Sequence, residues 1–251
     1  MTNSSDKQLL DYQSSYQLLE QLLSSSSVQP EQQLSLDSTR HTLSLSETNG
    51  EEILRFRLPS IFPAIRQQES GVDAHGVYHP VPTEESVESY FSRLSPSVPS
   101  YLILLMQAGH SALGTFVDGE NVHHKVIQKY MVRKKQGKAQ LTHLNTKGKS
   151  RAGSRIRLQN TVHFFEEINQ KLDEWDIVDE MDKLLYACTP RLWSLLFTSK
   201  CAPPFEKDDP RLHKLPVDTK KPNFKELLRI HYLAQRGEVI SKKSVDFGFA
   251  L

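Results

Sequence analysis

The chain has 251 residues, of which 37% are hydrophobic and 24% are charged, and its 31 basic and 30 acidic residues leave a formal net charge of +1. This composition is typical of a globular protein with one large core or two small ones. The longest apolar run, residues 101–106, is far too short to span a bilayer, so we expect no membrane partner.

The amino terminus and the cysteines indicate the compartment. The first residues lack the basic region and the apolar stretch of a secretory signal. The chain contains two cysteines, Cys188 and Cys201, and their spacing does not match a metal site. We therefore expect a reduced, cytoplasmic protein that uses no metal and no other cofactor.

Residues 1–100 predict an amino-terminal extension that contains a helix and a β-hairpin. The alternating runs 41–46 and 53–58 flank an Asn49-Gly50 turn and predict the hairpin. The Pro- and Ser-rich stretch 59–99 predicts a linker or extended cover, and its His75 and His79 are assigned no metal. Apolar spacings of three and four predict one helical stripe, formed by Leu9, Tyr12, Tyr16, Leu19 and Leu23.

From residue 101 the pattern changes to strands that are followed by alternating helices and strands. A buried strand over 101–109 precedes a second hairpin around Asp118-Gly119. Short elements follow: a strand over 183–188, a helix capped by Thr189 and a last helix opening at Asn223. The order predicts an α/β fold, a mixed β-sheet covered by helices. A long helix beginning near Ser154 is expected to bury Leu158, Val162, Phe165, Ile168 and Leu172.

Between this hairpin and the long helix lies an unusually basic segment. Residues 121–165 contain no Asp or Glu, although eleven Lys and Arg residues fall there. Clustered cations favour a polyanionic partner, because phosphates gain most from neighbouring Lys and Arg side chains. The alternative is a solvated basic loop without a partner.

Gln140 follows Gly137 inside this basic segment. Its amide does not titrate, so it is no general base, but it can orient a water molecule and donate to a developing oxyanion. A glutamine surrounded by cations suits an ester joined to a nucleic acid. The alternative is a surface glutamine in a loop without chemistry.

Three stretches follow one another within residues 101–235: "KYMVRKKQGKAQ", "KGKSRAGSRIRLQN" and "DPRLHKLPVDTKKPNFKELLRIH". The first two resemble the central signature, and the third the closing signature, of the Vms-like release-factor (VLRF) family, which is related to the middle domain of eukaryotic and archaeal translation termination factors. The helix departs from the family's Arg-Tyr-Asn-Glu, since only Asn160 and the preceding Arg157 fit. The central matches are Tyr130, Val132, Arg133, Gly137, Gln140, Lys147, Gly148, Lys149, Ala152, Gly153 and Ser154.

The resemblance implies a compact bacterial member, with a release-factor middle-domain or ribonuclease-H-like architecture over residues 101–251. It implies a monomeric ribosome-rescue enzyme that frees stalled nascent chains from peptidyl-tRNA on the large ribosomal subunit. Gly137 and Gln140 are the catalytic residues that it implies at the peptidyl-transferase centre. Contacts to rRNA and tRNA are expected from Arg133, Lys134, Lys135, Lys138, Lys147, Lys149, Arg151, Arg155 and Arg157.

Three alternatives remain open at this point. A tRNA 3′-end endonuclease would need a base for the 2′-hydroxyl, and His143 is the nearby residue that could serve. A non-catalytic ribosome- or RNA-binding module would keep the cations without the chemistry. A metal-dependent nuclease needs clustered acids, and the acid-free stretch 121–165 argues against it.

Overall fold

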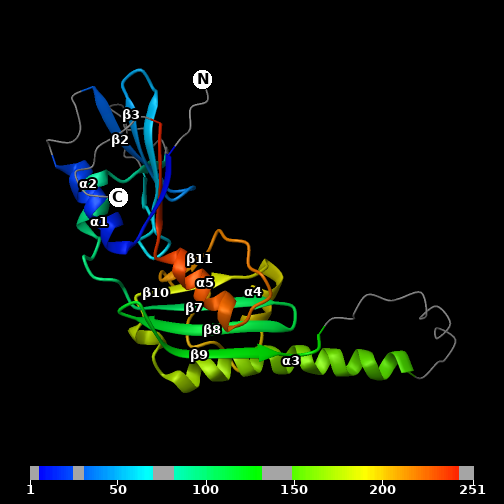
Figure 1. Cartoon of the computed structure of the whole chain (residues 1–251). Helices are drawn as coiled ribbons and strands as arrows, with labels where there is room; N and C mark the ends of the chain where they lie inside the picture. Colours follow the sequence, from blue (N-terminus) through cyan, green and yellow to red (C-terminus); the bar gives the residue numbers. More distant parts are fainter. Residues whose placement is uncertain (1–5, 25–30, 70–81, 132–148, 243–251) are drawn as a thin grey trace, which may run out of the picture. The chain divides into compact units, whose positions relative to one another are not determined.

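The computed structural model describes residues 6–24, 31–69, 82–131 and 149–242, with the side chains of helix α3 described from residue 158 onward (Figure 1). The chain forms two compact units, Met1–Val98 together with Tyr232–Leu251, and Pro99–His231. The expected division at residue 100 assigned everything after it to one domain, whereas the last strand belongs to the first unit. Among the described residues, no helix combines the length and the hydropathy that crossing a membrane requires.

The first unit contains an antiparallel sheet with the strand order β1-β12-β4-β3-β2. Helix α1 (Tyr12–Leu23) buries Leu18 and Leu19. A Cβ atom on Gly237 would lie 2.4 Å from Phe56 Cε2 and 2.9 Å from Ser15 Oγ, so α1, β4 and β12 meet closely at this glycine. The strands are β1 (Asp6–Leu10), β2 (Gln32–Asp37), β3 (Thr42–Glu47), β4 (Glu52–Arg57) and β12 (Gly237–Ser241).

The structure confirms the predicted hairpin and corrects the predicted helix. Strands β3 and β4 pair around Gly50, whose φ of +86° suits a residue without a Cβ atom. The helix begins at Tyr12 because Asp11 caps it, accepting a 2.8 Å hydrogen bond from the Ser14 N–H. Leu9 was expected on the helical stripe, but it lies in β1, which pairs with the distant β12, and it is 48% exposed.

The expected linker over 59–99 is wrong in part, because much of it is packed. Ile61, Phe62 and Tyr90 are each no more than 1% exposed. The stretch also contains β5 (Gln67–Glu69), β6 (Pro82–Glu84) and the short helix α2 (Val87–Ser92). His75 and His79 lie outside the described residues.

The second unit contains the predicted mixed sheet, with the order β11-β10-β7-β8-β9. Strands β7, β8 and β9 are antiparallel, and β10 runs parallel to both β7 and β11. The predicted turn at Asp118-Gly119 is confirmed, since both residues have positive φ. The strands are β7 (Tyr101–Gln107), β8 (His110–Val117), β9 (Glu120–Gln128), β10 (Lys183–Ala187) and β11 (Leu212–Lys214).

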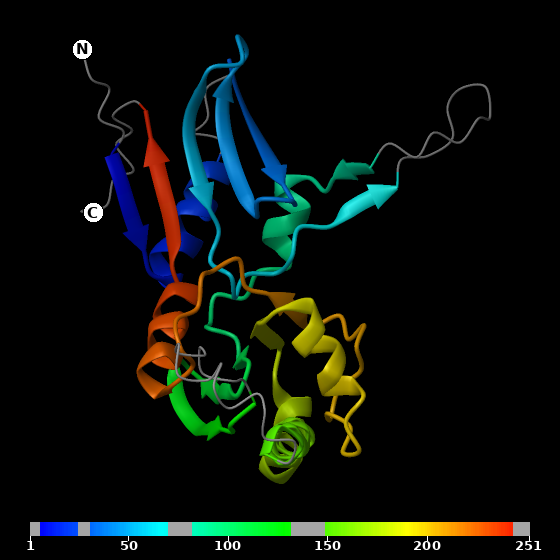
Figure 2. The same cartoon turned by 90° about the vertical axis from the view of Figure 1, so that its right-hand side faces the viewer.

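Helices cover both faces of this sheet, which confirms the α/β fold class (Figure 2). On one face, α3 (Lys149–Trp175) and α4 (Pro190–Phe197) pack into a hydrophobic core, and Thr189 caps α4 as predicted. The 3₁₀ helix η2 (Val178–Glu180) follows α3. On the other face, the His231 ring of α5 (Phe224–Ala234) stacks at 4.1 Å on Phe116 of β8.

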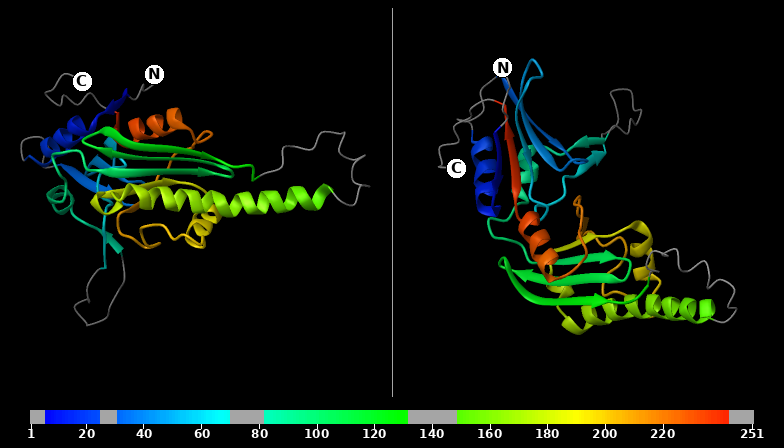
Figure 3. Two further views of the ribbon diagram at one scale, coloured as in Figure 1. Left: turned by 90° about the horizontal axis from the view of Figure 1, so that it is seen from below. Right: turned by 45° about the vertical axis from the view of Figure 1, so that its right-hand side comes forward.

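Helix α3 begins at Lys149, earlier than the expected Ser154, and only part of its predicted apolar face is buried. Phe165, Ile168 and Leu172 are at most 3% exposed, whereas Leu158 and Val162 are 69% and 41% exposed. Figures 1 and 3 show the reason, because the N-terminal part of α3 runs past the end of the sheet. The sequence predicted the helical period correctly, but it did not predict how far the sheet extends beneath the helix.

Alanine substitutions on α3 test this packing. Phe165→Ala is expected to destabilise the second unit by about 3–5 kcal/mol, because a buried aromatic side chain is lost and a cavity remains. Leu158→Ala on the same helix is expected to cost less than about 0.5 kcal/mol. Urea unfolding followed by circular dichroism measures both, and equal losses would contradict the packing described.

Candidate functional site

Most of the predicted site residues lie outside the described part of the chain. These are Gly137, Gln140, His143, Arg133, Lys134, Lys135, Lys138 and Lys147. The structure places Lys149, Arg151, Arg155 and Arg157 on the first turns of α3, without describing their side chains. What it does describe is the pair of elements that flank the Gly-x-x-Gln segment, β9 on one side and α3 on the other.

The exit from β9 is held by backbone contacts to the neighbouring turn. The Lys129 N–H donates a 2.9 Å hydrogen bond to the Gly109 carbonyl. Gly109 has a φ of +79°, and a Cβ atom there would lie 2.3 Å from the Lys129 carbonyl oxygen. Only glycine therefore fits against the chain at this point. Met131, the last described residue before the segment, packs against the core beneath the sheet.

Asn160 joins the two flanks. Its Nδ2 atom, on α3, donates a 3.0 Å hydrogen bond to the carbonyl oxygen of Tyr130. A side-chain amide that satisfies a backbone carbonyl fixes the position of the chain locally. Asn160 is also the residue that fits the family's helix motif, for which the sequence suggested no role. The contact indicates a positioning role at the base of the Gly-x-x-Gln segment.

An ion pair adds a second link between the flanks. Lys129 Nζ lies 2.7 Å from Glu167 Oε2, and both side chains are about one-third exposed (32% and 35%). Such a pair contributes roughly 0–1 kcal/mol at a surface, so its main effect is to neutralise one cation of the acid-free stretch. The described surface next to the segment is also apolar in part, because the side chains of Tyr130 and Leu158 are 50% and 69% exposed.

The titratable groups of α3 include one that the sequence did not indicate. His163 Nδ1 lies 3.0 Å from Glu166 Oε2, and the side chain is about half exposed (52%). A carboxylate three residues along a helix orients the imidazole and leaves the other ring nitrogen for a further contact, here Gln159 Nε2 at 3.4 Å. A second histidine, His213, lies on β11. Burial, and to a lesser extent the charge of Lys183, lowers the pKa of His213 to about 4, so its ring is neutral near pH 7.

The closing motif Asp-Pro-Arg-Leu forms a structural clamp. Arg211 binds Asp209 through two parallel contacts, Nε to Oδ1 at 3.0 Å and Nη2 to Oδ2 at 2.7 Å. Its remaining Nη1 donates to the carbonyl oxygens of Val178, at 2.9 Å, and Met181, at 3.2 Å. The motif thus fastens the start of β11 to the segment around η2.

The second half of the closing motif holds the loop before α5. Glu226 Oε1 accepts a 2.7 Å hydrogen bond from the Lys220 N–H and another from Arg229 Nη2 at 2.6 Å. Asn223 caps the helix as predicted, accepting from the Glu226 N–H at 2.8 Å. Gln107 of β7 donates 2.8 Å to the Thr219 carbonyl. These contacts give the motif a role in stabilising the fold, not in catalysis.

The model of the Bacteroidetes VLRF1 release factor family matches residues 101–242, which is more than half of the chain. The chain belongs to this family. The resemblance found in the sequence is therefore confirmed, and the VLRF1 match spans the second unit and continues through β12 of the first.

The chain is also similar to curated proteins of animals and to a solved structure. The tRNA endonuclease ANKZF1 of Mus musculus is 32% identical over 157 residues, which cover 61% of this chain and 21% of the relative. The tRNA endonuclease vms-1 of Caenorhabditis elegans is 29% identical over 128 residues, covering 50% and 20%. The match thus spans about a fifth of the length of these relatives. The solved structure titled Vms1 mitochondrial localization core aligns with a TM-score of 0.41 at 14% identity, over 93% of this chain and 90% of that one.

In this VLRF1 family member, the Asp209–Arg211 clamp makes stability depend on pH. The hydrogen bond from Arg211 is the main cause that holds the pKa of Asp209 below its usual value. The folded pKa therefore lies below the unfolded value near 4, so the stabilisation is complete above about pH 4 and is lost as pH falls through the folded pKa.

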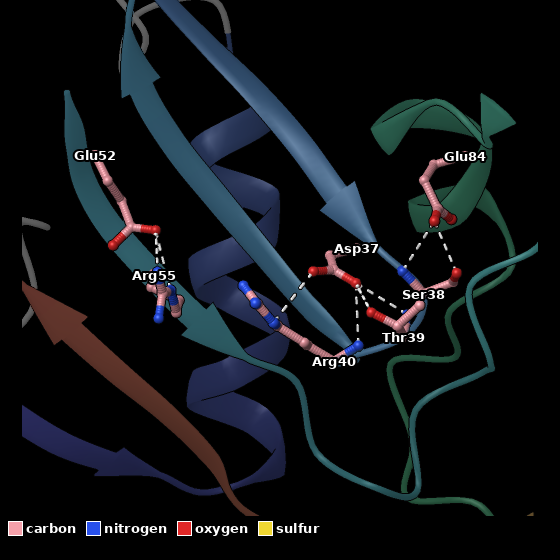
Figure 4. Close-up of polar contacts among 7 residues, drawn as sticks. All are labelled: Asp37, Ser38, Thr39, Arg40, Glu52, Arg55 and Glu84. Atoms are coloured by element: carbon pink, nitrogen blue, oxygen red, sulfur yellow. Dashed lines mark hydrogen bonds and ion pairs between the residues drawn. The ribbon is translucent and has the colours of Figure 1, made fainter. Parts of the chain in front are cut away.

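Arg211→Ala is expected to destabilise the second unit by about 2–4 kcal/mol at pH 7, because it removes the guanidinium that pairs with a mostly buried carboxylate and donates to two carbonyl oxygens. The difference in stability between pH 7 and pH 3, measured by urea unfolding, should be smaller in the variant by the contribution of Asp209. The matched control is Arg40→Ala, whose partner is Asp37 and whose side chain is 70% exposed (Figure 4). It should cost less than about 1 kcal/mol. An equal cost for both would contradict the clamp.

Proposed function

We propose that the chain is a ribosome-rescue release factor that frees stalled nascent chains from peptidyl-tRNA on the large ribosomal subunit. The observation that carries this proposal is the family-model match over residues 101–242, a range that contains Gly137 and Gln140. The factor acts as a monomer in the cytoplasm, and its partners are peptidyl-tRNA and rRNA. The cations of the acid-free stretch bind their phosphates.

The proposed reaction is hydrolysis of the ester that joins the nascent chain to the tRNA 3′ end. A water oxygen attacks the ester carbonyl carbon, the bond from that carbon to the ribose oxygen breaks, and the ribose hydroxyl leaves with a proton. Gln140 orients the water and donates a hydrogen bond to the oxyanion that develops on the carbonyl. Gly137 lets the backbone approach the substrate closely.

The described flanks support this mechanism through positioning. A donor stabilises a transition state only when it is held within a few tenths of an ångström of its place. The Asn160–Tyr130 hydrogen bond and the Gly109–Lys129 contact fix the exit from β9 to α3 and to the sheet. The segment that carries Gln140 thus starts from a rigid base.

Strand cleavage of the tRNA 3′ end is the second candidate, favoured by the names of the curated relatives as tRNA endonucleases. In this reaction a ribose 2′-hydroxyl attacks the adjacent phosphorus, the bond to the following 5′-oxygen breaks, that oxygen takes up a proton to leave as a hydroxyl, and a 2′,3′-cyclic phosphate forms. A base must remove the hydroxyl proton. His143 lies three residues after Gln140 and is the group proposed for that step.

The test uses isolated large subunits that carry a peptidyl-tRNA labelled on the peptide and on the tRNA 3′ end. Gel electrophoresis should show free peptide appearing over many turnovers while the tRNA keeps its 3′ label. If the tRNA loses its 3′ label together with the peptide, the reaction is strand cleavage and not ester hydrolysis. If the protein binds the subunits but neither free peptide nor cleaved tRNA appears, it is a non-catalytic binding module, and the proposal is overturned.

A further inference from the structure

A groove in the first unit lies at the edge of its sheet. It has a volume of about 610 Å³ and is formed by the end of α1, the edge strand β2 and residues 84–88. Its apolar lining comes from Leu22 and Leu23 of α1, Leu34 and Leu36 of β2, and Val87. In the described part of the chain, β2 pairs with β3 on one side and with no strand on the other.

The register of β2 determines which backbone groups face this groove. The Thr48 N–H donates a 2.8 Å hydrogen bond to the Glu31 carbonyl, so these opposed residues form a hydrogen-bonded pair. Pairs in an antiparallel ladder alternate, so every second residue of β2 directs its N–H and C=O away from β3. Leu34 and Leu36, opposite Leu45 and Leu43, are two such residues. Their outward groups offer a template for a further strand.

The wall opposite β2 is acidic. Glu84, Glu85 and Glu88 line the groove, and no Lys or Arg is among the described residues of its lining. Glu84 Oε1 accepts from the Ser38 N–H at 3.2 Å and from Ser38 Oγ at 2.7 Å, which fixes the carboxylate at the end of β2 (Figure 4). Its other oxygen, Oε2, is buried and has no hydrogen-bond partner among the described residues. A buried carboxylate oxygen without a donor is unfavourable unless a ligand supplies one.

The three acids differ in how far they are already neutralised. Glu85 is buried, pairs with Arg93 and accepts a 2.6 Å hydrogen bond from the Arg66 N–H. Within the described residues, Glu84 and Glu88 have no cationic partner, and Glu88 is exposed. The groove therefore combines outward backbone groups, an apolar floor and uncompensated negative charge.

We propose that this groove binds an extended peptide of another protein that carries Lys or Arg, adding beside β2 as a sixth strand. The peptide backbone pairs with the outward groups of Leu34 and Leu36, its apolar side chains contact Leu22, and its cations face Glu84 and Glu88. A second copy of the chain is a poor occupant, because pairing through β2 would bring the acids of both copies together. This inference does not depend on the proposed release activity.

The test uses the full-length, ¹⁵N-labelled protein and a synthetic peptide of alternating Lys and Val, seven residues long. The amide signals of Leu34 and Leu36 should shift on titration, and the matching Glu–Val peptide should bind at least about tenfold more weakly. Methylating alternate backbone nitrogens of the Lys–Val peptide should abolish binding, because it removes the donors of the added strand.

Charge variants provide the matched comparison. Glu88→Lys should weaken binding of the Lys–Val peptide by about tenfold, whereas Glu120→Lys, an exposed acid of β9 in the other unit, should leave it unchanged. Equal binding of the Lys and Glu peptides, shifts outside β2, or indifference to backbone methylation would each overturn the proposal. So would a dimer seen by sedimentation that disappears when β2 is mutated.

Discussion

Replacing Gln140 with alanine is expected to lower the rate of nascent-chain release by roughly a hundredfold or more, as for the loss of one oxyanion donor. Binding to large subunits should stay nearly unchanged, because the substitution removes an amide and no charge, and keeps Gly137 and the surrounding cations. Single-turnover release from labelled peptidyl-tRNA, measured beside subunit binding by sedimentation, separates the two effects.

Gln140→Glu is the informative companion variant. Its size is nearly that of the parent, but its carboxylate cannot donate and it places negative charge beside the oxyanion, so it should be no more active than Gln140→Ala. If Gln140→Ala releases like the parent, the glutamine is a bystander. If it fails to bind, the residue is an anchor for the ribosome and has no demonstrated part in the chemistry.

Reversing the charge of Lys134, Lys135 and Lys138 to Glu is expected to lower the affinity for large subunits by a factor on the order of a thousand at moderate salt. Each cation that neutralises a phosphate releases counterions, and the reversed charges add repulsion. The affinity of the parent should fall steeply with salt, and the slope of the logarithmic plot should become shallower by roughly 0.7–0.9 for each lost contact. Fluorescence anisotropy over a salt series measures both quantities.

The control is reversal of three exposed lysines elsewhere in the second unit, Lys200, Lys207 and Lys225. It makes the same change in net charge without touching the acid-free stretch. A general electrostatic attraction would weaken both variants alike. Similar losses of affinity in the two triple variants would therefore show that the basic segment is not the principal contact.

Locally specified features of the fold were predictable from the sequence. Both hairpin turns were visible as Asn-Gly and Asp-Gly pairs, and Gly50 and Gly119 have the positive φ that such turns require. The helices that begin after Thr189 and Asn223 were visible through their caps. These signals lie within a few residues of each other, so a single sequence is enough to find them.

Features that depend on distant segments were not predictable. The pairing of β1 with β12 joins the two ends of the chain, and no local pattern marks it. The exposure of Leu158 depends on where the sheet ends, not on the period of α3. For the site, the motif that contains Gln140 was visible in the sequence. The Asn160–Tyr130 hydrogen bond at its base was not, because it joins residues 30 positions apart.

The intact mass of the released nascent chain tests the central proposal most directly. Large subunits that carry a stalled chain of defined sequence are incubated with the protein, and the released chain is analysed by mass spectrometry without hydrolytic treatment. The proposed hydrolysis predicts a peptide with a free terminal carboxylate, together with a tRNA that keeps its complete 3′ end. A peptide that still carries 3′-terminal nucleotides on its carboxyl group would contradict the proposal and establish strand cleavage instead.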